Sequence, residues 1–147
     1  MSCVVTKRTK AVMPGFIKPQ LATLKDSAPS GAQWIHEIKY DGYRVQVHAD
    51  RGATKIFTRN GHDWTHRFSH IAGSFKLRSR TIFDGEVVVV HEGRTNFSEL
   101  QADLAKGPQD RMLFYAFDIL HHLNEAGSAP TSFFARGPVP DPDFGHR

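Results

Sequence analysis

Between residues 34 and 58 the chain alternates short β-forming runs with tight-turn sequences, and this alternation limits the folds open to it. The runs are Trp34 to Lys39, Tyr43 to Ala49 and Thr54 to Thr58. They are separated by Asp41-Gly42 and Asp50-Arg51-Gly52, which are typical turn residues. Because each connection is only a few residues long, consecutive strands must run antiparallel. The pattern predicts a series of β-hairpins.

Two more strands and two helices are expected downstream. Thr81 to Val90 and Met112 to Leu120 are strongly apolar and are expected to be buried strands. From Asp63 to Phe75, apolar residues recur at spacings of four and three, and Asp63 is placed to cap a helix there. A second helix is expected over Asn96 to Lys106, because this segment begins with a capping box and is followed by glycine. These elements predict an α+β protein with antiparallel sheets flanked by helices.

The distribution of proline and glycine predicts the domain organisation. Residues 1–33 are polar and interrupted by both residue types, so we expect an extended lead-in segment. Residues 34–123 hold all the expected strands and helices and are long enough for one domain. Residues 124–147 contain four prolines and three glycines, and we expect an irregular tail there.

Charge and cysteine content narrow the class of protein. The 147 residues carry a formal net charge of +4 and a pI near 9.4. This balance suits a polyanionic partner such as DNA or a nucleotide, although many ordinary proteins share it. Cys3 is the only cysteine, and the first twenty residues lack the apolar run of a signal peptide or membrane span. We therefore expect a cytoplasmic protein without a membrane partner.

The run EIKYDGYR, which starts at Glu37, concentrates four charges around a predicted strand-to-turn junction. If the strand forms, alternation places Glu37 and Lys39 on one face, with Trp34 and Ile38 pointing into the core. Two interpretations remain open for the charged face. It is either the wall of a pocket or the solvated side of a hairpin in which Asp41-Gly42 only makes the turn.

A second group of charges interrupts the apolar strand at Asp84-Gly85-Glu86. Asp84 and Glu86 are two residues apart, so both carboxylates face the same way. Carboxylates in so apolar a strand need a partner such as a cation, a metal or a ligand hydroxyl. Alternatively, Asp84-Gly85 is a β-bulge and Glu86 pairs with a surface lysine.

These segments together resemble a known family. KYDGYR, TRNG, FDGEVVV and FYAFDIL occur in the order and approximate spacing of the covalent nucleotidyltransferase motifs of ATP-dependent DNA ligases. PGFIKPQLATL, WIHEIKYDGYR and NFSELQADL are most similar to the ligase module of bacterial non-homologous end-joining ligases. The resemblance covers about residues 12–123. It implies an ATP-grasp-like nucleotidyltransferase fold, a nicked or broken duplex DNA substrate in repair or recombination, and a place in the bacterial cytosol or nucleoid.

The resemblance implies roles for the residues of the KYDGYR segment. Lys39 matches the nucleophile of the K-x-D-G motif, which attacks the α-phosphate of ATP to give a lysine-AMP intermediate. Asp41 matches the aspartate beside that lysine. Glu37 resembles the residue that recognises the adenine edge, and Arg44 resembles the one near the ribose and phosphates.

Three more residues acquire implied roles. Arg59 resembles the arginine that reaches the 5′-phosphate of a nick, and Glu86 the acid that contacts the ribose hydroxyls or helps to hold the metal. Phe117 would stack on the adenine, although an isolated phenylalanine in an apolar strand is more often a core residue. ATP and Mg²⁺ are the implied cofactors, since the departure of pyrophosphate needs its charge neutralised.

Beyond Leu123 the resemblance ends. Ligases of this family continue with an E-G motif, a K-x-K motif and an OB-fold, and none of these occurs in residues 124–147. The resemblance therefore predicts a fold that is truncated and incomplete at its C-terminus, with an open sheet edge.

Three functional hypotheses follow. The chain self-adenylates, alone or with a second polypeptide supplying the missing motifs. Alternatively, it is a catalytically inactive remnant that only binds nucleotide or DNA. A third class, the capping and RNA ligase relatives, shares the lysine motif but is disfavoured by the similarity to the end-joining ligases.

Overall fold

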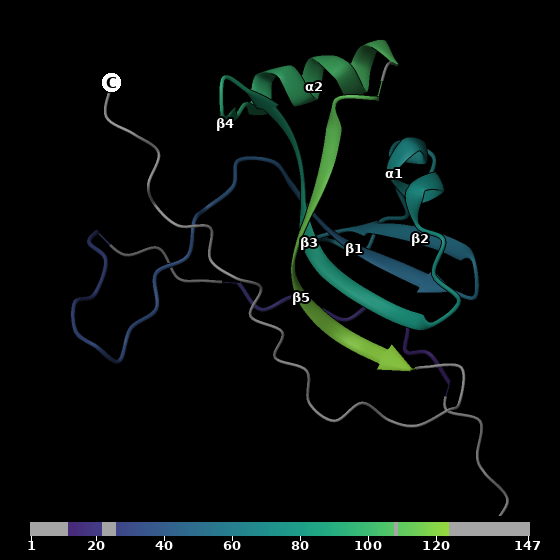
Figure 1. The fold of residues 1–147 in the computed structure, drawn as a ribbon, viewed down its shortest axis with the longest axis horizontal. Helices are drawn as coiled ribbons and strands as arrows, with labels where there is room; N and C mark the ends of the chain where they lie inside the picture. The colour runs from purple at the N-terminus through teal and green to yellow at the C-terminus, as the bar shows by residue number, and fades with distance from the viewer. Residues whose placement is uncertain (1–11, 22–25, 108, 124–147) are drawn as a thin grey trace, which may run out of the picture.

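The computed structural model describes residues 12–21, 26–107 and 109–123 (Figure 1). Its strands and helices are, in chain order, β1 (Tyr43–Asp50), β2 (Ala53–Thr58), α1 (Ser69–Ser74), β3 (Arg80–His91), β4 (Arg94–Thr95), α2 (Phe97–Lys106) and β5 (Met112–Leu123). The expected α+β class with an antiparallel sheet and few helices is confirmed. The tail expected over residues 124–147 lies outside the described residues, as does much of the lead-in.

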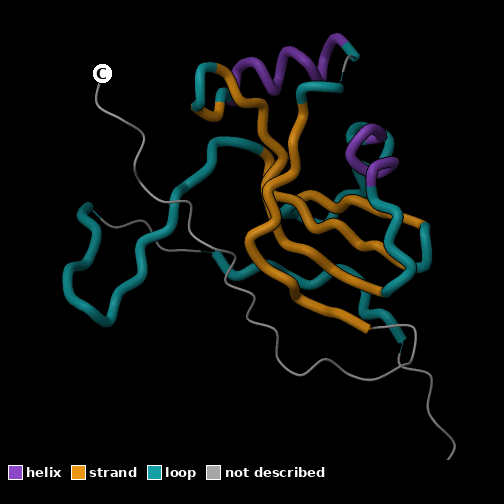
Figure 2. Tube along the Cα trace, in the orientation of Figure 1, coloured by secondary structure: helices purple, strands orange, loops and turns teal. Residues whose placement is uncertain are grey.

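All strands belong to one antiparallel sheet in which β3 is central (Figure 2). One edge of β3 pairs with β1, which in turn pairs with β2. The other edge pairs with β5, and the end of β3 folds back onto β4. The predicted β1–β2 hairpin is confirmed, and its two turn residues, Arg51 and Gly52, both have positive φ. Such turns match the twist of the flanking strands.

The core lies on the face of the sheet that carries both helices. Alternate residues of β1 and β3 point toward this face and meet side chains from β2, β5, α1 and α2. The buried cluster is formed by Val45, Val47, Ile56, Phe68, Ile71, Val87, Val89, Leu100 and Met112. Full burial of such a side chain contributes about 1.5–3 kcal/mol, so this cluster is what holds the helices to the sheet.

Helix α2 forms as predicted. The Oδ1 atom of Asn96 accepts the backbone N–H of Glu99 at 3.1 Å and so caps the first turn. At the other end, Gly107 adopts a φ of +103° and donates its N–H to the Asp103 carbonyl. Among the described residues, neither helix is long and apolar enough to span a bilayer.

The helix predicted over Asp63 to Phe75 is shorter than expected, since α1 begins only at Ser69. Asp63 does not cap it. Instead, the Asp63 carboxylate accepts hydrogen bonds from the backbone N–H and the hydroxyl of Thr65, and the Thr65 hydroxyl accepts the Ile56 N–H of β2. These local bonds favour a turn over a helix. The predicted apolar face nevertheless meets the core, because Phe68 is fully buried.

The strand predicted over Trp34 to Lys39 is wrong. These residues make no sheet pairing in the described structure, and Trp34 and Ile38 are 52% and 70% exposed instead of buried. The physical reason is that β1 is already paired along both edges, to β2 and to β3. No edge of β1 is therefore left for a hairpin across Asp41-Gly42.

The close approach of β3 and β5 gives a testable consequence at Gly85. A Cβ atom there would lie 2.4 Å from the Tyr115 carbonyl oxygen and 2.5 Å from the Phe114 ring. Gly85→Ala should lower the free energy of unfolding by about 2 kcal/mol, measured by urea denaturation. Gly73→Ala is the control, because its Cβ would meet nothing within 4 Å. Equal stability of the two variants would contradict this packing.

Candidate functional site

The face of the sheet opposite the core is polar and is crossed by residues 16–21, here called the strap. Arg44 and Gln46 point to this face because they alternate with the core residues of β1. Gln46 holds the strap at Ile17, accepting its N–H at 3.2 Å and donating to its carbonyl. Arg44 donates to the Gln20 carbonyl at 3.1 Å. The strap is thus fixed to β1 at two positions.

Arg44 and Asp84 form a bidentate ion pair at the centre of this face. The Nη2 and Nε atoms of Arg44 donate to the two carboxylate oxygens of Asp84 at 2.8 and 3.2 Å. Asp84 is only 3% exposed, and of the partners expected for a carboxylate in this apolar strand the structure shows a cation, Arg44. The hydrogen bond to Asp84 is the main cause that raises the pKa of Arg44, against the opposing effect of burial. Arg44 therefore presents a fixed positive charge.

Phe117 lies beside this ion pair because β5 is irregular there. Gly85 pairs with Ala116 and Asp84 with Asp118, so Phe117 is an extra residue between two paired positions. The Arg44 guanidinium carbon lies 5.5 Å from the centre of the Phe117 ring. The ring is 47% exposed, so Phe117 is not the core residue that an isolated phenylalanine most often is. An aromatic surface is thereby accessible next to a cation.

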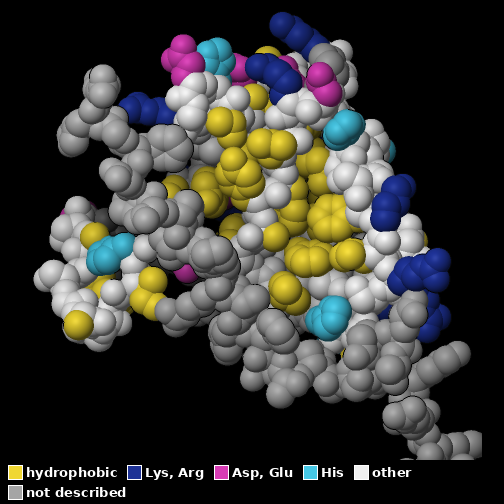
Figure 3. Space-filling model, viewed as in Figure 1, with side chains coloured by type: hydrophobic (Ala, Val, Ile, Leu, Met, Phe, Trp, Pro, Cys, Tyr) yellow, Lys and Arg dark blue, Asp and Glu magenta, His cyan; other side chains and the backbone are white. Residues whose placement is uncertain are grey.

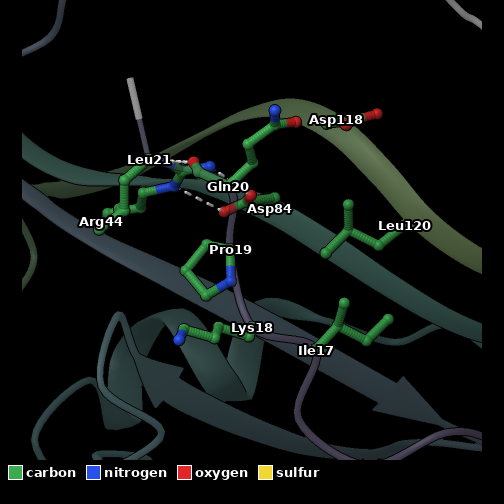
Figure 4. Close-up of a pocket in the computed structure, with 9 residues that line it drawn as sticks. All are labelled: Ile17, Lys18, Pro19, Gln20, Leu21, Arg44, Asp84, Asp118 and Leu120. Atoms are coloured by element: carbon green, nitrogen blue, oxygen red, sulfur yellow. Dashed lines mark hydrogen bonds and ion pairs between the residues drawn. The ribbon is translucent and has the colours of Figure 1, made fainter. Parts of the chain in front are cut away.

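A cavity of about 550 Å³ opens between the strap and the sheet (Figure 4). Its lining combines the ion pair with carboxylate, ammonium and apolar side chains: Ile17, Lys18, Pro19, Gln20, Leu21, Arg44, Asp84, Asp118 and Leu120. Its volume falls in the range of small-molecule sites. Lys39 does not line this cavity. Arg44, which lines it, pairs with Glu86 across β1 and β3, and Glu86 in turn binds the turn that follows Lys39.

The turn after Lys39 is held by three contacts from three strands. Glu86 of β3 accepts the Gly42 N–H at 3.1 Å, and the hydroxyl of Thr95 in β4 accepts the Asp41 N–H at 3.0 Å. The Tyr40 ring packs edge-on against Tyr115 of β5, with centroids 4.8 Å apart. Lys39 itself is exposed. The lysine therefore sits at the end of a fixed turn.

Glu86 is the second charged group of the site. Burial raises the pKa of its carboxyl, while the Gly42 hydrogen bond and the positive charges of Lys39 and Arg44 oppose this effect. The Gly42 hydrogen bond links Glu86 directly to the turn that follows Lys39. The structure thus brings together five of the predicted site residues, which are Lys39, Asp41, Arg44, Glu86 and Phe117.

Two predicted site residues stand apart from this group. Arg59 is exposed and directly follows β2; because Thr58 pairs with Val45, it lies at the same end of the sheet as Arg44. Glu37 lies in the exposed segment before Lys39 and makes no hydrogen bond or ion pair with other residues in the described parts of the chain. Its predicted pocket wall shared with Lys39 depended on a strand that does not form.

Sequence reasoning missed several contacts of the site. It did not select Thr95 or Gln46 as site residues, and it treated the strap only as part of an extended lead-in segment. No local signal marks these residues, because each acts on a partner 29 or more residues away. Only the register of the sheet brings the partners together.

Comparison with known proteins places the chain in a family. Residues 19–133 match the model of the ATP dependent DNA ligase domain, and the chain belongs to this family. It is 39% identical over 119 residues to the multifunctional non-homologous end joining protein LigD of Pseudomonas aeruginosa, covering 79% of this chain and 14% of that protein. Identity to LigD of Mycobacterium tuberculosis is 35% over 109 residues, covering 71% of this chain and 14% of that protein.

Solved structures agree with this assignment. A mycobacterial DNA ligase D complexed with ATP and MES superposes with a TM-score of 0.51 at 32% sequence identity, covering 63% of this chain and 30% of that one. The ligase domain of M. tuberculosis LigD gives the same values. The chain therefore shares the fold of part of a LigD ligase domain.

Because the ion pair is buried, removing one of its charges should lower the free energy of unfolding far more than removing both. Arg44→Met leaves Asp84 buried without its cation and should lower the free energy of unfolding by about 3 kcal/mol, measured by urea denaturation. The double variant Arg44→Met/Asp84→Leu removes both charges and should recover most of this loss. If the double variant is as unstable as the single one, the charge of Asp84 is not the cause.

Glu86 predicts a specific pH dependence of stability. Because the folded chain raises the pKa of Glu86 above its ordinary value of 4.5, its contribution is fully present below that value and is lost as pH rises through the folded pKa. Glu86→Gln should therefore gain stability relative to the unsubstituted protein as pH rises from about 4 to 7. Glu37→Gln, at an exposed carboxylate that makes no hydrogen bond or ion pair in the described parts of the chain, is the control. A flat difference for Glu86→Gln would contradict the prediction.

Proposed function

We propose that this chain is the nucleotide-binding part of an ATP-dependent DNA ligase adenylation domain and that Lys39 becomes linked to AMP. The main support is one arrangement: Asp84 fixes Arg44 against the exposed ring of Phe117, next to Glu86 and the Lys39 turn. Family membership and the related structure described with ATP point to the same ligand. The proposal gives a role to the partly buried charged residues on the face of the sheet opposite the core.

Each group has a physical reason for its proposed role. The Phe117 ring offers a stacking surface for adenine, and its electron-rich face tolerates the neighbouring Arg44. Arg44 would meet the ribose and phosphates, and the Glu86 carboxylate would accept hydrogen bonds from the ribose hydroxyls. Glu37 would recognise the adenine edge. That role requires the exposed segment before Lys39 to approach the site when nucleotide binds.

The proposed reaction is a phosphoryl transfer to nitrogen. The unprotonated Lys39 amine attacks the α-phosphorus, an N–P bond forms, and the P–O bond to the β-phosphate breaks. Pyrophosphate leaves with the electron pair of that bond, and the amine proton passes to solvent. Asp41 lies in the turn itself, two residues after Lys39, so its carboxylate would interact with the ammonium form of the lysine before reaction.

Magnesium would neutralise charge on the phosphates, and Glu86 is the proposed protein ligand. No group of three His, Cys, Asp or Glu side chains suited to a metal occurs in the described residues. Mg²⁺ usually binds through one or two carboxylates together with substrate phosphates and water. A single protein carboxylate such as that of Glu86 would therefore be enough for a metal that arrives with the nucleotide.

The proposed acceptor of AMP is nicked or broken duplex DNA, with Arg59 near the 5′-phosphate, in the bacterial cytosol or nucleoid. The chain spans 14% of the length of the LigD proteins above. Complete sealing would also need the E-G and K-x-K motifs, which a second polypeptide is proposed to carry. Adenylation of Lys39 is the step that this chain's own residues support.

The proposal is tested by incubation with ATP labelled at the α-phosphate and Mg²⁺, followed by detection of label on the denatured protein. Label should appear on the unsubstituted chain and be abolished in Lys39→Ala, because the nucleophile is gone. Lys76→Ala, at another exposed lysine, should label normally. Absence of label at every nucleotide concentration, or label that persists in Lys39→Ala, would overturn the proposal.

The alternative is a catalytically inactive remnant that only binds nucleotide or DNA. It is favoured by the finding that Lys39 lies outside the wall of the cavity that holds Arg44 and Asp84. Binding of ATP or of nicked duplex without any covalent label would select this alternative. DNA binding should then weaken steeply with salt, as expected for phosphate contacts.

A further inference from the structure

We propose that Thr95 is a positioning residue for the adenylation reaction, acting through the backbone of the Lys39 turn. This inference rests on the proposed function. The hydroxyl oxygen of Thr95 accepts the Asp41 N–H at 3.0 Å, across 54 residues of sequence. Asp41 is two residues after Lys39, so Thr95 fixes the turn on which the lysine depends.

Thr95 is itself held on both sides. It pairs with Val90 in the β3–β4 hairpin, whose turn residues Glu92 and Gly93 both have positive φ. The next residue, Asn96, donates its N–H to the Val89 carbonyl and caps α2. The hydroxyl is thereby attached to a short hairpin and a capped helix. A hydroxyl held in this way can fix the position of the turn relative to the sheet.

The turn needs such an anchor because the segment before it provides none. Trp34, Ile35 and Ile38 are each more than half exposed, and Lys39 is exposed too. The contacts that hold the turn therefore all involve residues that follow the lysine. They are the Tyr40 ring, the Asp41 amide and the Gly42 amide.

Thr95 differs from the other hydrogen-bond acceptor of the turn in what it can do when nucleotide binds. Glu86 carries a charge and is proposed to meet the ribose and the metal, so its contact with Gly42 competes with ligand. Thr95 is neutral and holds the turn at a different amide. It can therefore keep Lys39 in place while Glu86 engages the nucleotide.

Thr95→Val keeps the size of the side chain and removes the acceptor, whereas Thr95→Ser keeps the hydroxyl. We expect Thr95→Val to slow single-turnover labelling of Lys39 on the order of tenfold, since small misplacement of a nucleophile is enough for that. The dissociation constant for ATP should not change, and Thr95→Ser should restore the rate. Thr54→Val is the matched control, because the Thr54 hydroxyl has no hydrogen-bond partner among the described residues.

A second measurement separates this inference from the proposed function. Solvent exchange of the Asp41 amide, followed by NMR, should be faster in Thr95→Val than in the unsubstituted chain and in Thr95→Ser, with or without nucleotide. Unchanged exchange in Thr95→Val overturns the inference even if the chain labels. Wild-type labelling rates in Thr95→Val overturn it as well. A chain that never labels but shows the exchange difference refutes the proposed function and retains Thr95 as the anchor of the turn.

Discussion

Strand β3 is hydrogen-bonded along both edges, and the rest of the structure depends on this double pairing. Since side chains alternate along a strand, fixing β3 in the sheet also fixes which residues face the helices and which face the strap. Val87 and Val89 thereby enter the core, while Asp84 and Glu86 are committed to the opposite face. A register shift of one residue would exchange the two sets. The register of β3 therefore determines both the packing of the core and the composition of the polar site.

Local irregularities of β5 add an aromatic surface to the polar groups of the site. The surface of the sheet is not polar throughout, since Figure 3 shows hydrophobic side chains gathered over the part that β3 and β5 occupy in Figure 1. On β5 itself, Leu113, Phe117 and Ile119 are more than one third exposed. The irregularity that leaves Phe117 unpaired places its ring next to Arg44. An aromatic surface, a cation and a buried carboxylate thus meet because β5 carries extra residues, and a regular ladder would separate them.

Sequence reasoning recovered features whose cause is local and failed where the cause is distant. The α2 cap and the Arg51-Gly52 turn depend on neighbouring residues and were predicted correctly. The strand expected to begin at Trp34 has suitable composition, but both edges of β1 are occupied by strands from elsewhere in the chain. For the site, the apolar character of the strand indicated that Asp84 needs a partner, yet only the sheet register identified that partner as Arg44. The family motifs pointed to the candidate site residues, but they did not indicate which residues those side chains contact.

Lys39 lies between a segment that the sheet holds in place and a segment that is exposed. After it, the chain is held by contacts to β3, β4 and β5; before it, apolar side chains such as Trp34 and Ile38 remain exposed. Burying those side chains against a bound ligand or a partner chain would be favourable. Lys39 therefore lies between a turn that the sheet holds in place and a segment whose apolar side chains are not packed in the core. The same exposed residues that refute the predicted strand are the ones through which this segment would approach the site in the proposed function.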